Sequence, residues 1–177
     1  MLARGHRLVA TARKLTQLDD LVARHPETCR ALALDVTEAS QVKAAVAQAA
    51  EAFGRIDVVV NNAGCGLVGA LEELSDEQIA RNFDTNFFGA LGVIRAALPI
   101  LRAQRRGHIV NISAAAVISN YAGFSIYGAA KWALEGVSES LSAELKPLGI
   151  KVIIVSFPDG RFTVPLNQNK RISHRWY

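Results

Sequence analysis

The sequence predicts an α/β protein built on a doubly wound parallel sheet. Five short apolar runs recur along the 177 residues, longer stretches with helical spacing separate them, and half of all residues are hydrophobic. Parallel strands need crossover connections, and right-handed crossovers running in both directions place helices on both faces of a sheet. We therefore expect a single domain over residues 1–177 with three layers, helix, sheet and helix.

Each strand and helix is predicted from its own stretch. The predicted strands are residues 7–12, 31–36, 56–61, 108–113 and 151–157. The predicted helices are residues 14–24, 38–53, 75–104 and 125–146. Ser75 and Gln78 have the spacing of a capping box, and Thr37 is a predicted N-cap. Gly54 and Gly149 are predicted helix ends, because glycine adopts the backbone conformation that terminates a helix.

Composition narrows the class of protein. The formal net charge of +4 comes largely from two short basic runs, residues 102–108 and 169–175, which we interpret as solvated loop ends rather than as a nucleic-acid surface. Cys29 and Cys65 are far apart and lack neighbouring histidines, so we expect neither a disulfide framework nor a metal site. No apolar stretch has the length of a membrane span. We expect a cytoplasmic protein with no nucleic-acid or membrane partner.

The segment NNAGCGLVGA, residues 61–70, contains a G-x-G-x-x-G spacing. A dinucleotide fingerprint needs a helix that starts at this loop and a second strand that ends in an acidic residue about twenty positions on. Asp84 stands at that distance, but the residues before it form a polar helical pattern, and the capped helix begins at Ser75. The glycine spacing is therefore interpreted as coincidental.

The same segment, with motifs in the rest of the chain, resembles the short-chain dehydrogenase/reductase family. The motifs are LDVT at 34–37, NNAG at 61–64, DTNFFG around Asn86, HIVNIS at 108–113, YGAAK with Tyr127 and Lys131, and the stretch 158–163. The resemblance implies a Rossmann-like fold and an oxidoreductase that interconverts an alcohol and a carbonyl by hydride transfer with a nicotinamide cofactor. The implied partner is a small-molecule alcohol or carbonyl.

Tyr127 and Lys131 stand four residues apart on a predicted helix and so share a face. An ammonium near a phenol favours the phenolate, so we expect a lowered pKa at Tyr127. The resemblance implies that Tyr127 exchanges a proton with the substrate oxygen and that Lys131 also holds the nicotinamide ribose. It implies that Asn86 holds a water of the proton relay. The alternatives are a buried tyrosine, a surface lysine and an asparagine that bonds its own helix.

The family hydroxyl that contacts the substrate oxygen stands thirteen positions before the tyrosine, where this chain has Ala114. Ser113, one residue earlier, is the candidate that could replace it. On a strand an offset of one residue points a side chain to the opposite face, so we predict weakened or altered carbonyl chemistry.

The resemblance also implies a cofactor site. Arg13 follows the strand whose end selects the cofactor, and a guanidinium suits the 2′-phosphate, which favours NADP(H) over NAD(H); the alternative is a solvated helix-start arginine. Asp35 and Val36 are expected to bracket the adenine. The full implied set is Arg13, Asp35, Val36, Asn61, Ala63, Gly64, Tyr127, Lys131, Pro158 and Thr163. Cys65, Val117, Tyr121 and Phe124 suggest an apolar substrate cleft, and substrate identity and reaction direction cannot be read.

The chain departs from the family pattern at both ends. The first strand and the Gly-rich loop are missing before residue 7, and Pro158-Asp159-Gly160 replaces a Pro-Gly pair. We expect an incomplete dinucleotide-binding domain without the middle strand of the sheet. A second hypothesis follows, a non-catalytic fragment or pseudoenzyme that acts only by oligomerisation through the helices at 75–104 and 125–146, which the family uses to form homodimers or homotetramers.

Overall fold

The computed structural model describes residues 2–114 and 122–156, which contain five parallel strands in two sheets. The strands are β1 (Leu8–Ala12), β2 (Cys29–Ala33), β3 (Val58–Asn61), β4 (Gly107–Ile112) and β5 (Ile150–Val155). β1 pairs with β2, and β4 pairs with both β3 and β5, all in parallel register. The five predicted strands are confirmed, and the second one begins two residues and ends three residues earlier than expected.

Helices connect the strands. They are α1 (Asp19–Arg24), α2 (Ala39–Phe53), α3 (Asp76–Phe83), α4 (Gly89–Gln104) and α5 (Ser125–Leu145). Short 3-10 segments are Leu2–Arg4, Leu15–Leu18, Leu71–Glu73 and Lys146–Leu148, and a π-helical segment, Asp84–Phe88, joins α3 to α4. The long helix predicted for 75–104 is therefore continuous, but its middle turn is widened.

The predicted helix ends were mostly right. The Ser75 hydroxyl accepts a hydrogen bond from the Gln78 N–H at 3.3 Å, and the Gln78 side chain accepts one from the Ser75 N–H at 2.9 Å, which completes the capping box. Gly54 adopts a left-handed conformation with φ of 75° after α2. The prediction for Thr37 was wrong, because the helix begins one residue later and Thr37 instead donates to the Asp35 carboxylate.

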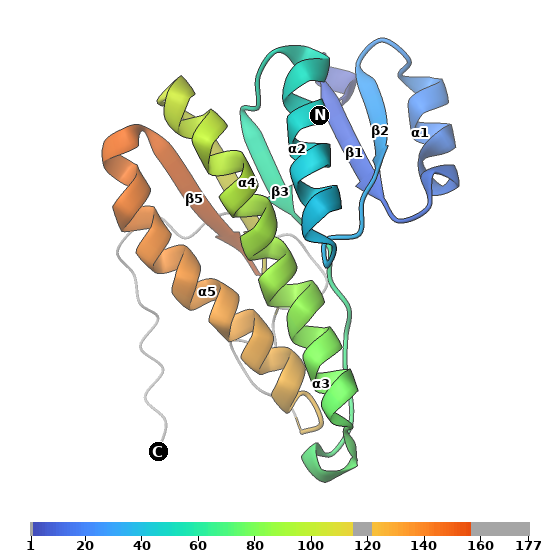
Figure 1. The fold of residues 1–177 in the computed structure, drawn as a ribbon, viewed down its shortest axis with the longest axis vertical. Helices are drawn as coiled ribbons and strands as arrows, with labels where there is room; N and C mark the ends of the chain where they lie inside the picture. Colours follow the sequence, from blue (N-terminus) through green and yellow to red (C-terminus); the bar gives the residue numbers. More distant parts are fainter. Residues whose placement is uncertain (1, 115–121, 157–177) are drawn as a thin grey trace.

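Helices α1 and α2 lie on opposite faces of the strands because the two crossovers run in opposite directions. The chain moves outward from β1 to β2 and returns toward β3, and right-handed crossovers in opposite directions place α1 and α2 on opposite faces. α2, α4 and α5 lie side by side in front of the strands (Figure 1). On β3, Val59 faces this helical layer while Val58 and Val60 stay 40% and 51% exposed on the other face.

Two apolar clusters hold the helical layer to the strands. The larger cluster joins α4, β4, α5 and β5 through Ile94, Ala97, Leu101, Ile109, Leu145 and Ile150, each at most 1% exposed. The smaller one packs Val42 and Ala45 of α2 against Leu34, which follows β2. Because α2 also packs against α4, the β1–β2 pair is attached to the remainder mainly through α2.

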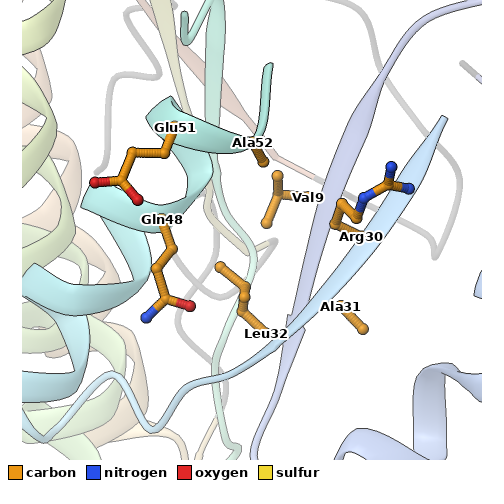
Figure 2. Close-up of a pocket in the computed structure, with 7 residues that line it drawn as sticks. All are labelled: Val9, Arg30, Ala31, Leu32, Gln48, Glu51 and Ala52. Atoms are coloured by element: carbon orange, nitrogen blue, oxygen red, sulfur yellow. The ribbon is translucent and has the colours of Figure 1, made fainter. Parts of the chain in front are cut away.

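No strand lies between β1 and β3 among the described residues, as the sequence predicted. Beside this interval an open hollow of about 400 Å³ separates α2 from the β1–β2 pair. Its lining is Val9, Arg30, Ala31, Leu32, Gln48, Glu51 and Ala52 (Figure 2).

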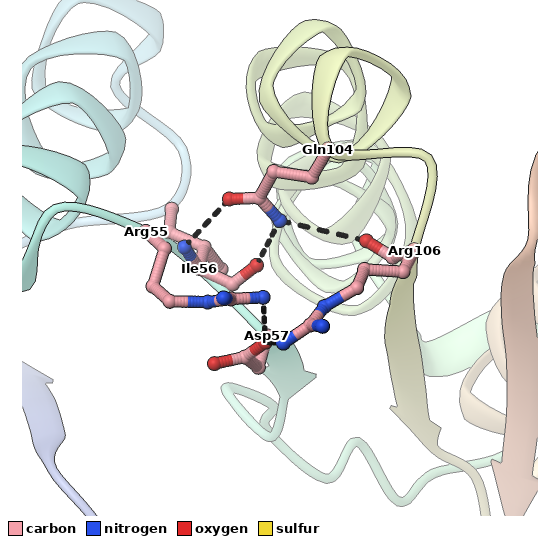
Figure 3. Close-up of polar contacts among 5 residues, drawn as sticks. All are labelled: Arg55, Ile56, Asp57, Gln104 and Arg106. Atoms are coloured by element: carbon pink, nitrogen blue, oxygen red, sulfur yellow. Dashed lines mark hydrogen bonds and ion pairs between the residues drawn. The ribbon is translucent and has the colours of Figure 1, made fainter.

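A polar clamp closes the end of α4. The Gln104 side chain accepts from the Ile56 N–H at 3.1 Å and donates to the Ile56 carbonyl at 2.6 Å (Figure 3). Its amide thus satisfies both backbone groups of Ile56, as the backbone of a neighbouring strand would. Next to it, Arg55 and Arg106 contact the Asp57 carboxylate at 2.6 and 3.5 Å. The clamp fixes the start of β3 relative to α4.

The continuous helix Asp76–Gln104 has the length and mean hydropathy of a membrane span, with 33% of its most apolar window buried. Its residues Ile94, Ala97 and Leu101 belong to the larger core cluster, which is the packing of a core helix. The absence of a membrane partner stays a prediction.

Candidate active site

The candidate site lies where the loop after β3, the π-helical segment and the first turns of α5 meet. The carboxyl ends of parallel strands share one edge of a sheet, and in open α/β sheets this edge is where ligands bind. Tyr127, Lys131 and Asn86, predicted from distant parts of the sequence, come to this edge.

Asn86 brackets the peptide of Cys65. It is 1% exposed and lies in the π-helical segment, a local widening that is frequent at functional sites. Its Oδ1 accepts from the Cys65 N–H at 3.2 Å, and its Nδ2 donates to the Cys65 carbonyl at 2.9 Å. The side chain therefore fixes the loop after β3 against the long helix.

Gly64 brings backbone close to two of the candidate residues. A methyl group on its Cα would lie 2.8 Å from Asn86 Oδ1 and 3.5 Å from Lys131 Nζ. The first distance is shorter than van der Waals contact, so this position requires glycine for space.

Lys131 is buried, with 5% of its surface exposed, and its Nζ donates to the carbonyl of Ile112 at 3.0 Å. Burial lowers the pKa of this ammonium, while the negative charge of an ionised Cys65 opposes that shift. The alternative of a surface lysine is wrong.

Tyr127 is half-buried and lies one turn before Lys131, whose Nζ is 5.9 Å from the centre of the phenol ring. Its ring packs edge-on against Phe124 with 6.3 Å between centroids. The sequence reasoning expected a lowered pKa here, and that expectation was wrong for this structure. Burial raises the pKa of Tyr127, and the charge of Cys65 raises it further, since a second anion nearby is unfavourable.

Ser113 is 4% exposed, and its hydroxyl donates to Glu135 Oε1 on α5, which also accepts from the Ser156 hydroxyl at 3.3 Å. Ser113 is thus engaged with a carboxylate that lies one turn beyond Lys131. Ala114 supplies no hydroxyl. A catalytic role for Ser113 stays a prediction.

The predicted adenine end lies beyond β1 and β2. Asp35 Oδ1 accepts from the Thr37 N–H at 3.0 Å and from the Thr37 hydroxyl at 2.7 Å. These two bonds lower the pKa of Asp35, and the positive charges of Arg13 and Arg81 add to them. Arg13 is exposed, and its charge is close enough to act on Asp35. Val36 contacts the long helix, since a methyl on Gly89 would lie 2.7 Å from its Cγ2.

The remaining predicted residues divide into three cases. Ala63 and Gly64 are exposed at the loop tip. Asn61 is 8% exposed, and its amide donates to Asn111 Oδ1 at 2.7 Å, so this part of the side chain is turned into the core. Pro158 and Thr163 lie outside the described residues, as do Val117 and Tyr121 of the predicted cleft.

Two residues at the site, the buried Asn82 and the partly buried Glu135, were not singled out from the sequence. Asn82 donates to the Cys65 carbonyl at 3.0 Å, and Glu135 receives the Ser113 hydroxyl. A helical spacing signal existed for each, because Asn82 precedes Asn86 by four residues and Glu135 follows Lys131 by four. In residues 2–114 and 122–156, no three His, Cys, Asp or Glu side chains converge as they would around a metal ion.

Known proteins share this architecture. The short chain dehydrogenase family model matches residues 1–171. The 3-ketodihydrosphingosine reductase of Bacteroides thetaiotaomicron is 40% identical over 171 residues, which are 96% of this chain and 60% of that protein. The chain thus spans about 60% of the length of this curated relative.

Solved structures agree with this match. A short-chain dehydrogenase from Streptomyces avermitilis has 42% sequence identity and a TM-score of 0.84, over 86% of this chain and 56% of that one. A metagenomic short-chain oxidoreductase in complex with NADP has 30% identity and a TM-score of 0.80, over 85% and 70% of the two chains.

The chain belongs to the short-chain dehydrogenase family. Its relatives include named oxidoreductases and reductases, and its fold is the α/β, Rossmann-like, doubly wound fold predicted from the sequence.

Proposed function

We propose that this chain supplies the acid–base site of an NADP(H)-dependent oxidoreductase that interconverts an alcohol and a carbonyl. The observation that supports the proposal most is the meeting of three elements at Gly64. Its Cα faces Asn86 on the π-helical segment and Lys131 on α5, and Tyr127 lies one turn before that lysine.

The residues fit a nicotinamide cofactor. Ala63 and Gly64 expose backbone at the loop after β3, and the Lys131 ammonium lies beside Gly64. At the other end, the exposed Arg13 offers a guanidinium for a 2′-phosphate and Asp35 keeps an acceptor oxygen. The bound cofactor would supply or accept the hydride.

The chain's own residues would move the proton. In the reductive direction the Tyr127 hydroxyl donates its proton to the substrate oxygen. Because burial raises its pKa and so weakens it as an acid, positive charge at the site must favour loss of this proton. In the oxidative direction the phenolate is required, so the positive charges of Lys131 and of the bound nicotinamide must offset the effect of burial. Asn86 holds the neighbouring loop in place.

The first experiment is a fluorescence titration of the purified protein with NADPH and with NADH. Tighter binding of NADPH, reversed by Arg13→Asp, supports the proposal. Absence of binding at millimolar cofactor would instead favour a non-catalytic protein that acts by oligomerisation. Turnover on a panel of alcohols and carbonyls, with Tyr127→Phe as the inactive control, then tests the chemistry.

A second experiment addresses the missing hydroxyl. Ala114→Ser restores a donor thirteen positions before the tyrosine, and such a donor contributes about a hundredfold or more to oxyanion stabilisation. A rise in turnover supports the view that the wild-type site lacks this donor. No rise in an active protein would mean that Ser113 or another group already serves.

A further inference from the structure

Asn82 is a buried asparagine next to the candidate site that the proposed mechanism does not use. It lies on the last turn of α3, four residues before Asn86, and is 2% exposed. α3 packs against α5, the helix that carries Tyr127 and Lys131. The side chain of Asn82 reaches from α3 to Cys65 in the loop after β3.

The contacts of Asn82 converge on one peptide. Its Nδ2 donates to the Cys65 carbonyl at 3.0 Å, and the same carbonyl accepts from Asn86 Nδ2 at 2.9 Å. Asn86 Nδ2 also donates to the backbone carbonyl of Asn82 at 2.9 Å. The two asparagine side chains thus donate to the same Cys65 carbonyl, while the bond from Asn86 to residue 82 uses backbone that any residue there would supply.

This arrangement is not explained by stability alone. The Oδ1 atom of Asn82 is buried and has no hydrogen-bond partner among the described residues. A buried acceptor without a partner costs free energy, whereas an apolar side chain of similar size would carry no such cost. The contribution of the amide at this position is therefore the bond that its Nδ2 donates to the Cys65 carbonyl.

The Cys65 peptide is linked to the candidate catalytic side chains through Gly64. Gly64 precedes Cys65, and a methyl group on its Cα would lie 2.8 Å from Asn86 Oδ1 and 3.5 Å from Lys131 Nζ. A shift of the Cys65 peptide would move Gly64 and change the space between these two side chains. Misplacement of catalytic groups by about 1 Å can cost up to about a hundredfold in rate.

We propose that Asn82 is a positioning residue of the acid–base site, which acts by holding the Cys65 carbonyl in place together with Asn86. The inference rests on the proposed function, in that the site it positions is the one assigned there. Asn82 itself touches neither substrate nor cofactor in this role.

The main test uses Asn82→Asp, which keeps the shape of the side chain and removes the N–H donor. We expect kcat to fall about tenfold, with the KM for NADPH nearly unchanged, because the cofactor contacts are elsewhere. A variant that merely loosened the fold would weaken cofactor binding as well. Unchanged kcat, or a rise in KM that accounts for the whole loss, would overturn the proposal.

A second measurement does not depend on enzymatic activity. Iodoacetamide alkylates the Cys65 thiolate with loss of iodide, and Cys29, which is 0% exposed, is the internal control. Release of the Cys65 peptide in Asn82→Leu, which removes the donor without adding a charge beside the Cys65 sulfur, should raise the alkylation rate of Cys65 several-fold and leave Cys29 unlabelled. An equal rate in both proteins would overturn the proposal even if the wild type had no turnover, which would separately reject the proposed function.

Ser138→Ala is the matched control for loss of a buried polar group, since Ser138 is 1% exposed and contacts Leu134 and Asn111 instead. It should lower thermal stability without raising the alkylation rate of Cys65. If Asn82→Asp or Asn82→Leu fails to fold, Asn82→Ser is measured in the same two ways. A Cys65 that becomes equally reactive in Ser138→Ala would show that any loss of stability exposes it and would overturn the proposal.

Discussion

The ammonium of Lys131 donates a hydrogen bond to the carbonyl of Ile112 at 3.0 Å, which ties α5 to the carboxyl end of β4. The lysine is held at the sheet edge before any ligand binds. Because burial lowers its pKa, the unfolded chain binds the lysine proton more tightly than the folded one. The charged form therefore opposes folding at neutral pH, and this cost disappears as the pH rises toward the usual value of about 10.4 for lysine.

Lys131→Met should remove activity without unfolding the protein. We expect turnover to fall by about a hundredfold or more, because the acid–base system loses its charged member. The free energy of unfolding should stay within about 1 kcal/mol of wild type, since the lost hydrogen bond is offset by removal of a buried charge. Chemical denaturation and initial rates measure both quantities. Lys151→Met, at an exposed lysine on β5, is the control and should keep the turnover and the free energy of unfolding of the wild type.

Gly64→Ala should disturb the site because its methyl group would stand 2.8 Å from Asn86 Oδ1. Inserting a methyl group into such a contact costs about 1–3 kcal/mol of stability. The midpoint temperature of thermal unfolding and the turnover rate should both fall. Gly66→Ala is the matched control, since a methyl there meets no atom within 4 Å. Equal stability of the two variants would contradict the packing argument.

The Tyr127 phenol should titrate above the usual value of about 10 in the protein without cofactor. The difference between the ultraviolet titrations of wild type and Tyr127→Phe isolates this hydroxyl. Cys65→Ser should move the midpoint back toward the usual value, because the thiolate charge is removed while burial remains. A midpoint below 10 in the wild type would contradict this assignment of causes.

The Thr37 hydroxyl should control the acidity of Asp35. In Thr37→Val the carboxylate loses one of the two hydrogen bonds that lower its pKa, so its pKa should rise toward the usual value. Because the folded pKa is lowered, the carboxylate contributes stability above the unfolded value of about 3.9 and loses it as the pH falls through the folded value. Carbon-detected NMR titration of Asp35 checks the shift. Asp35→Asn should flatten the stability curve in this acid range.

Gln104→Ala should lower the free energy of unfolding by about 1–3 kcal/mol, since both Ile56 backbone groups lose their partner. Urea denaturation measures the change. Gln48→Ala, at an exposed position on α2, is the control and should stay within about 0.5 kcal/mol of wild type.

The order of strands and helices could be predicted because it follows from local periodicity and capping. The runs before Asn61 and around Ile109 are apolar at consecutive positions. The capping box of Ser75 needs only the four adjacent residues from Ser75 to Gln78. The widened turn at Asp84–Phe88 could not be predicted, because its sequence still has ordinary helical spacing.

Some residues of the candidate site could likewise be found from the sequence, and others needed the tertiary structure. Tyr127 and Lys131 were identified from the motifs that resemble the family, and their spacing of four residues adds only that the two side chains share a helix face. The roles of Asn82 and Glu135 needed tertiary contacts, with Cys65 and Ser113 respectively, that join segments more than fifteen residues apart.

The sequence by itself determined the succession of parallel strands and most helix ends, because each depends on neighbours within a turn or a strand, and its motifs pointed to Tyr127 and Lys131 as candidate site residues. Only the tertiary structure decided the ionisation of Tyr127 and the hydrogen bonding of Ser113. Burial and the partners of a polar group are set by segments that meet through folding, and these fix the free energy of its charged form.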